Sequence, residues 1–172
     1  MLKMIGMVLI IGSFTGIGAS QRQQFRRRVI VLGDMISVLD MISGELTFHL
    51  TSIPEIVAQL AHDKRPSVAQ LFGAMHAMIT QDDSLSLTYK WMKTFREHGS
   101  EVGLTEEDIG ILCDLSEFIG KYDAKSQQKS VDYARERLSR QMEIASAEMK
   151  SKGMVYRTCC IAAGILLVLV LI

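Results

Sequence analysis

Hydrophobic residues form two uninterrupted runs at the ends of the chain and follow a helical spacing between them. The first run is Met4–Ala19 and the second is Cys159–Ile172, and neither contains a charged residue. From residue 22 to residue 153, apolar residues recur every three or four positions, which is the period of an amphipathic helix. The pattern predicts a helical domain, residues 22–153, between two apolar segments.

The two apolar ends are predicted to be membrane helices. Residues 154–172 would extend roughly 28 Å as a helix, about the thickness of a hydrocarbon core. Arg157, their one charge, lies near the start, where its side chain can reach the interface beside Tyr156. Residues 1–21 are predicted to be an N-terminal transmembrane anchor. A buried core helix at the C-terminal end and a signal peptide cleaved near Gly18 remain the alternatives.

Basic residues at the inner ends of both apolar segments predict the orientation of the chain. Positive charge beside a membrane helix favours the cytoplasmic side. The domain of residues 22–153 is therefore expected in the cytoplasm, with both termini on the far face of the membrane. The residues that set this topology are Arg22, Arg26, Arg27, Arg28, Lys150, Lys152 and Arg157.

The glycines Gly12, Gly16 and Gly18 imitate the nucleotide-binding loop of short-chain dehydrogenases, and Tyr89 and Lys93 supply a Tyr-x-x-x-Lys pair. A dinucleotide fold needs repeated βαβ units, and no segment after residue 20 has the pattern of a buried parallel strand. The glycines are better explained as a close-packing face on a membrane helix. The enzyme interpretation is therefore disfavoured.

The central residues are predicted to form an all-α, compact bundle of about six helices. The first carries an apolar stripe over Leu32–Leu46. Ser52-Ile-Pro-Glu55 is a capping box that opens a short second helix. Ser67, just after Pro66, opens the third. Asp82-Asp83-Ser84 is expected to break the chain and cap a fourth helix, which carries Trp91 and Phe95.

Gly99 and Gly103 are predicted to flank a loop, and Thr105 to start a fifth helix. Gly120-Lys-Tyr-Asp123 forms the turn before a long sixth helix, and Gly153 is a candidate hinge before the C-terminal segment. The inward face of the fifth helix is expected to be Ile109, Leu112, Leu115, Phe118 and Ile119. The seam of the sixth alternates steps of three and four, like a coiled coil: Val131, Ala134, Leu138, Met142, Ala145 and Met149.

Residues that commonly perform chemistry are scattered. The histidines His49, His62, His76 and His98 do not have metal-ligand spacing. Cys113 lies among apolar residues and is expected in the core, and the other two cysteines fall in the C-terminal apolar run, which favours no disulfide framework. We expect no enzyme activity, no metal and no cofactor, and a protein that works by binding.

Two charged clusters are candidates for partner contact. Acids in the first turn of a helix usually stabilise its positive end, although they can also form a docking patch. Arginines on the sixth helix alternate with acids, which is typical of a solvated face and not of a nucleic-acid track. Lys and Arg together number 19, as do Asp and Glu, so nucleic acid is not an expected partner. The candidates are Glu106, Glu107, Asp108, Arg135, Arg137 and Arg140.

The whole chain resembles the stage III sporulation protein AB family of endospore-forming bacteria. The likeness lies in the order and spacing of several short motifs together with the two apolar ends. These motifs are Met1-Leu-Lys-Met-Ile-Gly6, Leu50-Thr-Ser-Ile-Pro-Glu55, Asp83-Ser-Leu-Ser-Leu-Thr88, Leu104-Thr-Glu-Glu-Asp108, Phe118-Ile-Gly-Lys-Tyr-Asp123 and Gly164-Ile-Leu-Leu-Val-Leu169.

This resemblance implies a subunit of a multi-protein channel complex in the mother-cell membrane that faces the forespore. The soluble part is also similar to the helical domains of the F-type platform protein of type II secretion systems. By that analogy the chain would dock a cytoplasmic secretion-type ATPase and contact other membrane subunits of the sporulation complex. The alternative is an exported, tail-anchored helical adaptor on the outer face of the membrane.

Overall fold

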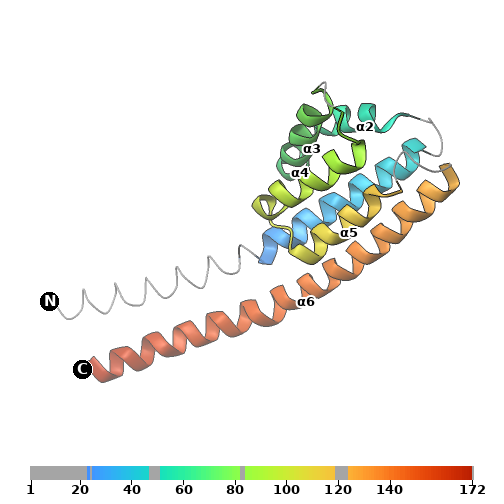
Figure 1. Cartoon of the computed structure of the whole chain (residues 1–172). Coiled ribbons are helices and arrows are strands. Elements are labelled where there is room, and N and C mark those ends of the chain that lie inside the picture. The colour runs from blue at the N-terminus through green and yellow to red at the C-terminus, as the bar shows by residue number, and fades with distance from the viewer. Residues whose placement is uncertain (1–22, 24, 47–50, 82–83, 119–123, 172) are drawn as a thin grey trace. The chain divides into compact units, whose positions relative to one another are not determined.

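The computed structural model describes residues 23, 25–46, 51–81, 84–118 and 124–171, with the backbone alone for residue 124 and residues 152–171. These residues form six helices and no strand (Figure 1), which confirms the predicted all-α class. The helices are residues 25–44, α2 (Ile53–Leu60), α3 (Pro66–Ile79), α4 (Leu87–Val102), α5 (Glu106–Ser116) and α6 (Ala124–Leu171).

Several predictions fall outside the described residues. They concern the N-terminal anchor, the glycines of the dehydrogenase-like loop, His49, Asp82-Asp83 and the turn at residues 120–123. Over the part of the chain that was described, no helix has both the length and the apolar composition to cross a bilayer. The backbone of α6 is helical through Gly153, with no break at the residue that was named as a candidate hinge.

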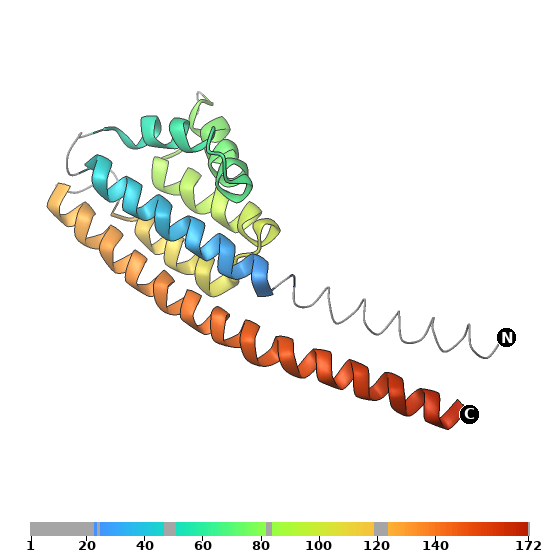
Figure 2. The ribbon, with the colours of Figure 1, turned by 180° about the vertical axis from the view of Figure 1, so that it is seen from behind.

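Two units divide the chain, one of residues 30–142 and one of residues 1–29 with 143–172. In the larger unit α2 packs on α3, α3 on α4 and α4 on α5 (Figure 1, and from behind in Figure 2). Phe72, Trp91 and Phe95 form its centre, with ring centroids 5.3–6.0 Å apart and mostly edge-to-face. Each is at most 1% exposed, so aromatic burial joins α3 to α4.

The predicted helix ends agree with the structure for α2 but not for α4. The capping box of α2 is confirmed, since the Glu55 carboxylate accepts the Ser52 backbone N–H at 3.1 Å. The fourth helix is capped by Ser86, whose hydroxyl accepts the Tyr89 N–H, and not by the Asp82–Ser84 segment. Gly99 lies inside α4, which ends at Val102. Gly103 follows with φ 107°, a left-handed conformation that favours glycine.

A polar cluster joins the first helix to the connection between α2 and α3. Ser67 does not open α3, which begins at Pro66; instead its hydroxyl donates to Asp34 Oδ2 at 2.6 Å. The Arg65 guanidinium donates to both carboxylate oxygens of Asp63, at 2.8 and 2.7 Å, and to the Asp34 carbonyl at 3.3 Å. The hydrogen bonds from Arg65 lower the pKa of Asp63 to about 2. Side chains distant in sequence thus determine how this connection lies.

Within the larger unit, residues 124–142 of α6 pack on the other helices through the predicted seam. Val131, Ala134 and Leu138 are buried, and Met142 is half-buried. Two ion pairs flank the seam: Arg135 lies 2.5 Å from Asp40 of the first helix, and Arg137 lies 2.8 Å from Asp114 of α5. The coiled-coil-like spacing therefore does mark the packed face of this helix.

Candidate functional site

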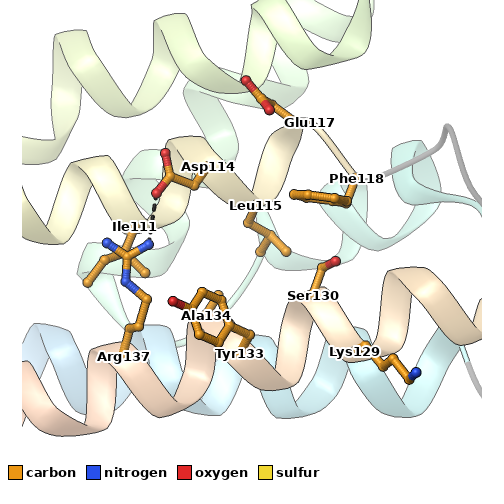
Figure 3. A pocket seen from close by; sticks show the side chains of 10 residues that line it. All are labelled: Ile111, Asp114, Leu115, Glu117, Phe118, Lys129, Ser130, Tyr133, Ala134 and Arg137. Carbon is orange, nitrogen blue, oxygen red and sulfur yellow. Dashed lines mark hydrogen bonds and ion pairs between the residues drawn. The ribbon is translucent and has the colours of Figure 1, made fainter.

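A groove of about 500 Å³ lies between the second half of α5 and the N-terminal part of α6 (Figure 3). It is called the α5–α6 groove below. Residues of both helices contribute to it, together with Glu117 and Phe118, which follow α5. Its lining residues are Ile111, Asp114, Leu115, Glu117, Phe118, Lys129, Ser130, Tyr133, Ala134 and Arg137.

The floor of the groove is apolar and its edges carry exposed aromatic rings. Ile111, Leu115 and Ala134 are buried at the floor. Phe118, which was predicted to face the core, lies beyond the end of α5 at Ser116 and is 40% exposed. Tyr133 of α6 is 63% exposed. Exposed aromatic side chains around an apolar depression are typical of a protein-binding site.

Four charged residues contribute to the lining of the groove: Asp114, Glu117, Lys129 and Arg137. In Figure 3 the side chains of Asp114 and Arg137 meet across it, whereas the Glu117 carboxylate and the Lys129 ammonium extend away from it. At one end Arg137 Nη1 donates to Asp114 Oδ2 at 2.8 Å. The Arg137 guanidinium also lies over the Tyr133 ring, 5.7 Å from its centroid, as in a cation–π contact. The ion pair therefore positions both Arg137 and the ring.

The charged residues at the other end of the groove form no ion pair with each other. Within the described part of the chain, Glu117 and Lys129 have no ion-pair partner, and each is exposed. The groove thus offers apolar area and two exposed aromatic rings.

Two kinds of reactive group, metal ligands and thiols, bear on the sequence-based expectations in the described residues. No group of three or more His, Cys, Asp or Glu side chains is placed to hold a metal ion in the ranges that were described. Cys113 is buried, as predicted, and burial raises the pKa of its thiol despite the neighbouring Arg96. A thiol with a raised pKa is a weak nucleophile.

The predicted contact residues do not form one site. Glu106 and Glu107 are exposed at the start of α5, whereas Asp108 is fully buried and its carboxylate accepts the Thr105 N–H at 2.9 Å. Asp108 is thus a member of the capping box of α5, whose N-cap residue is Thr105. Arg135 pairs with Asp40 and Arg140 with Glu136, each at 2.5 Å. Of the six residues, Arg137 alone lines the groove.

The topology-setting residues are described only in part. Arg26, Arg27 and Lys150 are exposed, and Arg28 lies 3.9 Å from Glu148. The side chains of the remaining three, Arg22, Lys152 and Arg157, lie outside the described residues.

Three residues that line the groove were not predicted as site residues from the sequence: Phe118, Lys129 and Tyr133. A signal for Tyr133 was present, because it lies between the seam positions Val131 and Ala134 but points off the apolar stripe. A single exposed aromatic side chain is common on protein surfaces, so this signal alone did not identify a site. No comparable signal marked Phe118, because the apolar period of the fifth helix continued through it.

The chain is similar to one family of known proteins over nearly its whole length. The model of the stage III sporulation protein AB family matches residues 3–172. Stage III sporulation protein AB of Bacillus subtilis (strain 168) is 23% identical over 172 residues, which is 99% of each chain. A solved structure of stage III sporulation protein AB is 24% identical, covers 73% of this chain and 93% of its own, and superposes with a TM-score of 0.49.

Proposed function

The chain belongs to the stage III sporulation protein AB family, and we propose that it is a non-enzymatic platform subunit of a sporulation-specific channel complex. In this role the helical domain docks a cytoplasmic secretion-type ATPase and the apolar ends contact lipid and other membrane subunits of the complex. The observation that carries the docking role is the α5–α6 groove, with its apolar floor and exposed aromatic rings.

The membrane part of this proposal is supported by the sequence at the two ends. Residues 158–172 contain no charge, and neither do residues 4–21. Basic side chains follow the first apolar run and precede the second, and Arg26, Arg27 and Lys150 are exposed. This pattern favours a hairpin topology with the helical domain in the cytoplasm, at the membrane between mother cell and forespore.

A reporter fused after Ile172 tests the topology. A reporter that functions only outside the cytoplasm should be active, and one that functions only inside should be inactive. The reverse result would contradict the hairpin topology and favour the exported, tail-anchored arrangement.

Calorimetry tests the docking role directly. The full-length chain in lipid nanodiscs is titrated with the purified secretion-type ATPase of the same organism at low and high salt. We expect saturable binding at about micromolar Kd, roughly 8 kcal/mol, that weakens with salt because exposed charges contribute. A folded chain that does not bind the ATPase at either salt concentration would exclude this partner.

A further inference from the structure

We propose that the exposed basic side chains of Arg26, Arg27 and Lys150 bind the anionic headgroups of a phospholipid bilayer. These three residues are called the basic collar below. The inference rests on the proposed function, in which the apolar ends contact lipid, and it specifies the charge of that lipid.

Charge is divided unequally between the two units of the chain. Residues 1–29 and 143–172 contain eight basic residues and two acids, Glu143 and Glu148, whereas residues 30–142 contain eleven basic residues and 17 acids. The zero net charge of the whole chain therefore conceals a basic smaller unit and an acidic larger unit. An anionic surface attracts the first and repels the second.

The two acids of the smaller unit do not neutralise the collar. Glu148 Oε2 lies 3.9 Å from Arg28 Nη1, so this carboxylate already has a partner. Glu143 lies seven residues before Lys150 along α6, about 10 Å further from the apolar run. No acid occurs in residues 1–33 or 149–172. The collar therefore has no acidic neighbour in sequence on the side of either apolar run.

The collar residues lie next to the Arg28–Glu148 ion pair, on two helices. Arg26 comes two residues before Arg28 and Lys150 two residues after Glu148, each about 3 Å along its helix toward the neighbouring apolar run. The side chains of Arg26, Arg27 and Lys150 are all exposed. In the part of the chain that the structure describes, neither Arg26 nor Lys150 has an ion-pair partner. The ion pair thus brings exposed positive charge from both helices to one place.

The distance from the collar to the apolar runs favours a lipid surface. Lys150 precedes the charge-free residues 158–172 by eight residues of α6, about 12 Å, and Arg26 follows the charge-free residues 4–21 by five residues. The headgroup layer of a bilayer is about 5–8 Å thick on each side, and long basic side chains extend toward it. Lipid phosphates are therefore within reach when the apolar runs lie in the hydrocarbon. A nucleic acid would also meet the acidic larger unit, which repels it.

The experiment uses the full-length chain, synthesised in the presence of vesicles. The vesicles contain phosphatidylcholine alone or equal parts phosphatidylcholine and phosphatidylglycerol, and flotation at low and high salt measures membrane association. The chain is then extracted from the mixed vesicles in mild detergent, and the two lipids that it retains are quantified. Each basic side chain near an anionic surface contributes up to about fivefold, so we expect retained phosphatidylglycerol to exceed phosphatidylcholine about tenfold.

Two charge-matched double variants test the site. Arg26→Gln with Lys150→Gln removes two collar charges but keeps the polar side chains, and it should lower the enrichment of phosphatidylglycerol about fivefold. Arg135→Gln with Arg140→Gln removes two charges from exposed arginines of α6 in the larger unit and should leave the enrichment unchanged. Circular dichroism checks that both variants keep the helical content of the wild-type chain.

Each other result overturns the assignment. Equal retention of the two lipids by the wild-type chain would refute the collar, and equal loss of enrichment in both variants would make it an effect of net charge. Binding of a polyglutamate peptide that the collar variant abolishes, without enrichment of phosphatidylglycerol, would assign the collar to an acidic protein.

Failure of the collar and failure of the proposed membrane topology are separable by flotation. A chain that floats with both kinds of vesicle at high salt but shows no lipid enrichment refutes the collar alone. A chain that floats only with phosphatidylglycerol vesicles and is released by salt keeps the collar but refutes the membrane anchors. A chain that floats with neither refutes both.

Discussion

The indole Nε1–H of Trp91 in α4 donates to the main-chain carbonyl oxygen of Leu112 in α5 at 2.8 Å. Trp91 is 1% exposed, so this hydrogen bond is shielded from water. It fixes the register of α5 along α4, since a shift of either helix by one residue would break the hydrogen bond. The α5 side of the groove is in this way tied to the aromatic core.

Trp91→Phe should destabilise the domain by about 1–3 kcal/mol, because it removes this hydrogen bond and leaves a small void. Urea unfolding of the full-length chain in detergent, followed by circular dichroism, measures the change. Tyr89→Phe on the same helix is the control, and its effect should stay within about 0.5 kcal/mol. If the two variants were equally stable, the Trp91–Leu112 bond would contribute nothing measurable.

Alanine at two helical glycines should change stability in opposite directions. At Gly99 an added Cβ would lie 2.7 Å from Ile109 Cγ1 and 2.8 Å from Cδ1, while at Gly73 it would meet nothing within 4 Å. Alanine is the better helix former by about 1 kcal/mol, but overpacking costs about 1–3 kcal/mol. Gly73→Ala should therefore stabilise the chain and Gly99→Ala destabilise it. Stabilisation by both changes would mean that α5 shifts freely against α4.

The stability that depends on ionised Asp63 should be lost in acid. Its pKa is lowered from 3.8 to about 2 in the folded chain, chiefly by the side-chain hydrogen bond from Arg65. A lowered pKa contributes stability that is fully present above 3.8 and disappears as the pH falls through about 2. Unfolding of wild-type and Asp63→Asn chains across that range measures it. The difference between them should shrink with falling pH, and a constant difference would show that ionisation of Asp63 is not involved.

Arg137→Gln should leave stability nearly unchanged although it removes an ion pair. The side chains of Arg137 and Asp114 are 36% and 66% exposed, and pairs in water contribute about 0–1 kcal/mol. Thermal unfolding of the full-length variant checks this. A loss above about 2 kcal/mol would make the Arg137–Asp114 pair a structural contact rather than part of a binding surface.

The helices could be predicted because their signals are local. Apolar residues at steps of three and four and capping residues such as Ser52 and Thr105 act within one or two turns of the backbone. The buried seam of α6 followed from the same spacing. The family resemblance was also readable from motif order, and the family match over residues 3–172 confirmed it.

The incorrect predictions concern residues whose role depends on a contact with another helix. Ser67 resembles a helix cap, but Asp34, thirty-three residues earlier, accepts its hydroxyl. Gly99 resembles a helix end, yet it lies inside α4 where the Ile109 side chain approaches closely. Neither partner is adjacent in the sequence, so spacing alone could not reveal the choice.

By itself the sequence determined the helical class, most helix starts, the two apolar ends and the family, because each depends on period, composition or motif order. Only the tertiary structure decided which charges pair, which aromatic rings stay exposed and where a groove opens. From the sequence, Arg137 was one of six equivalent candidates, and the packing of α5 and α6 placed it alone among them in the groove. A site between two helices depends on how their side chains pack together. The apolar pattern of one helix does not specify its packing against the other.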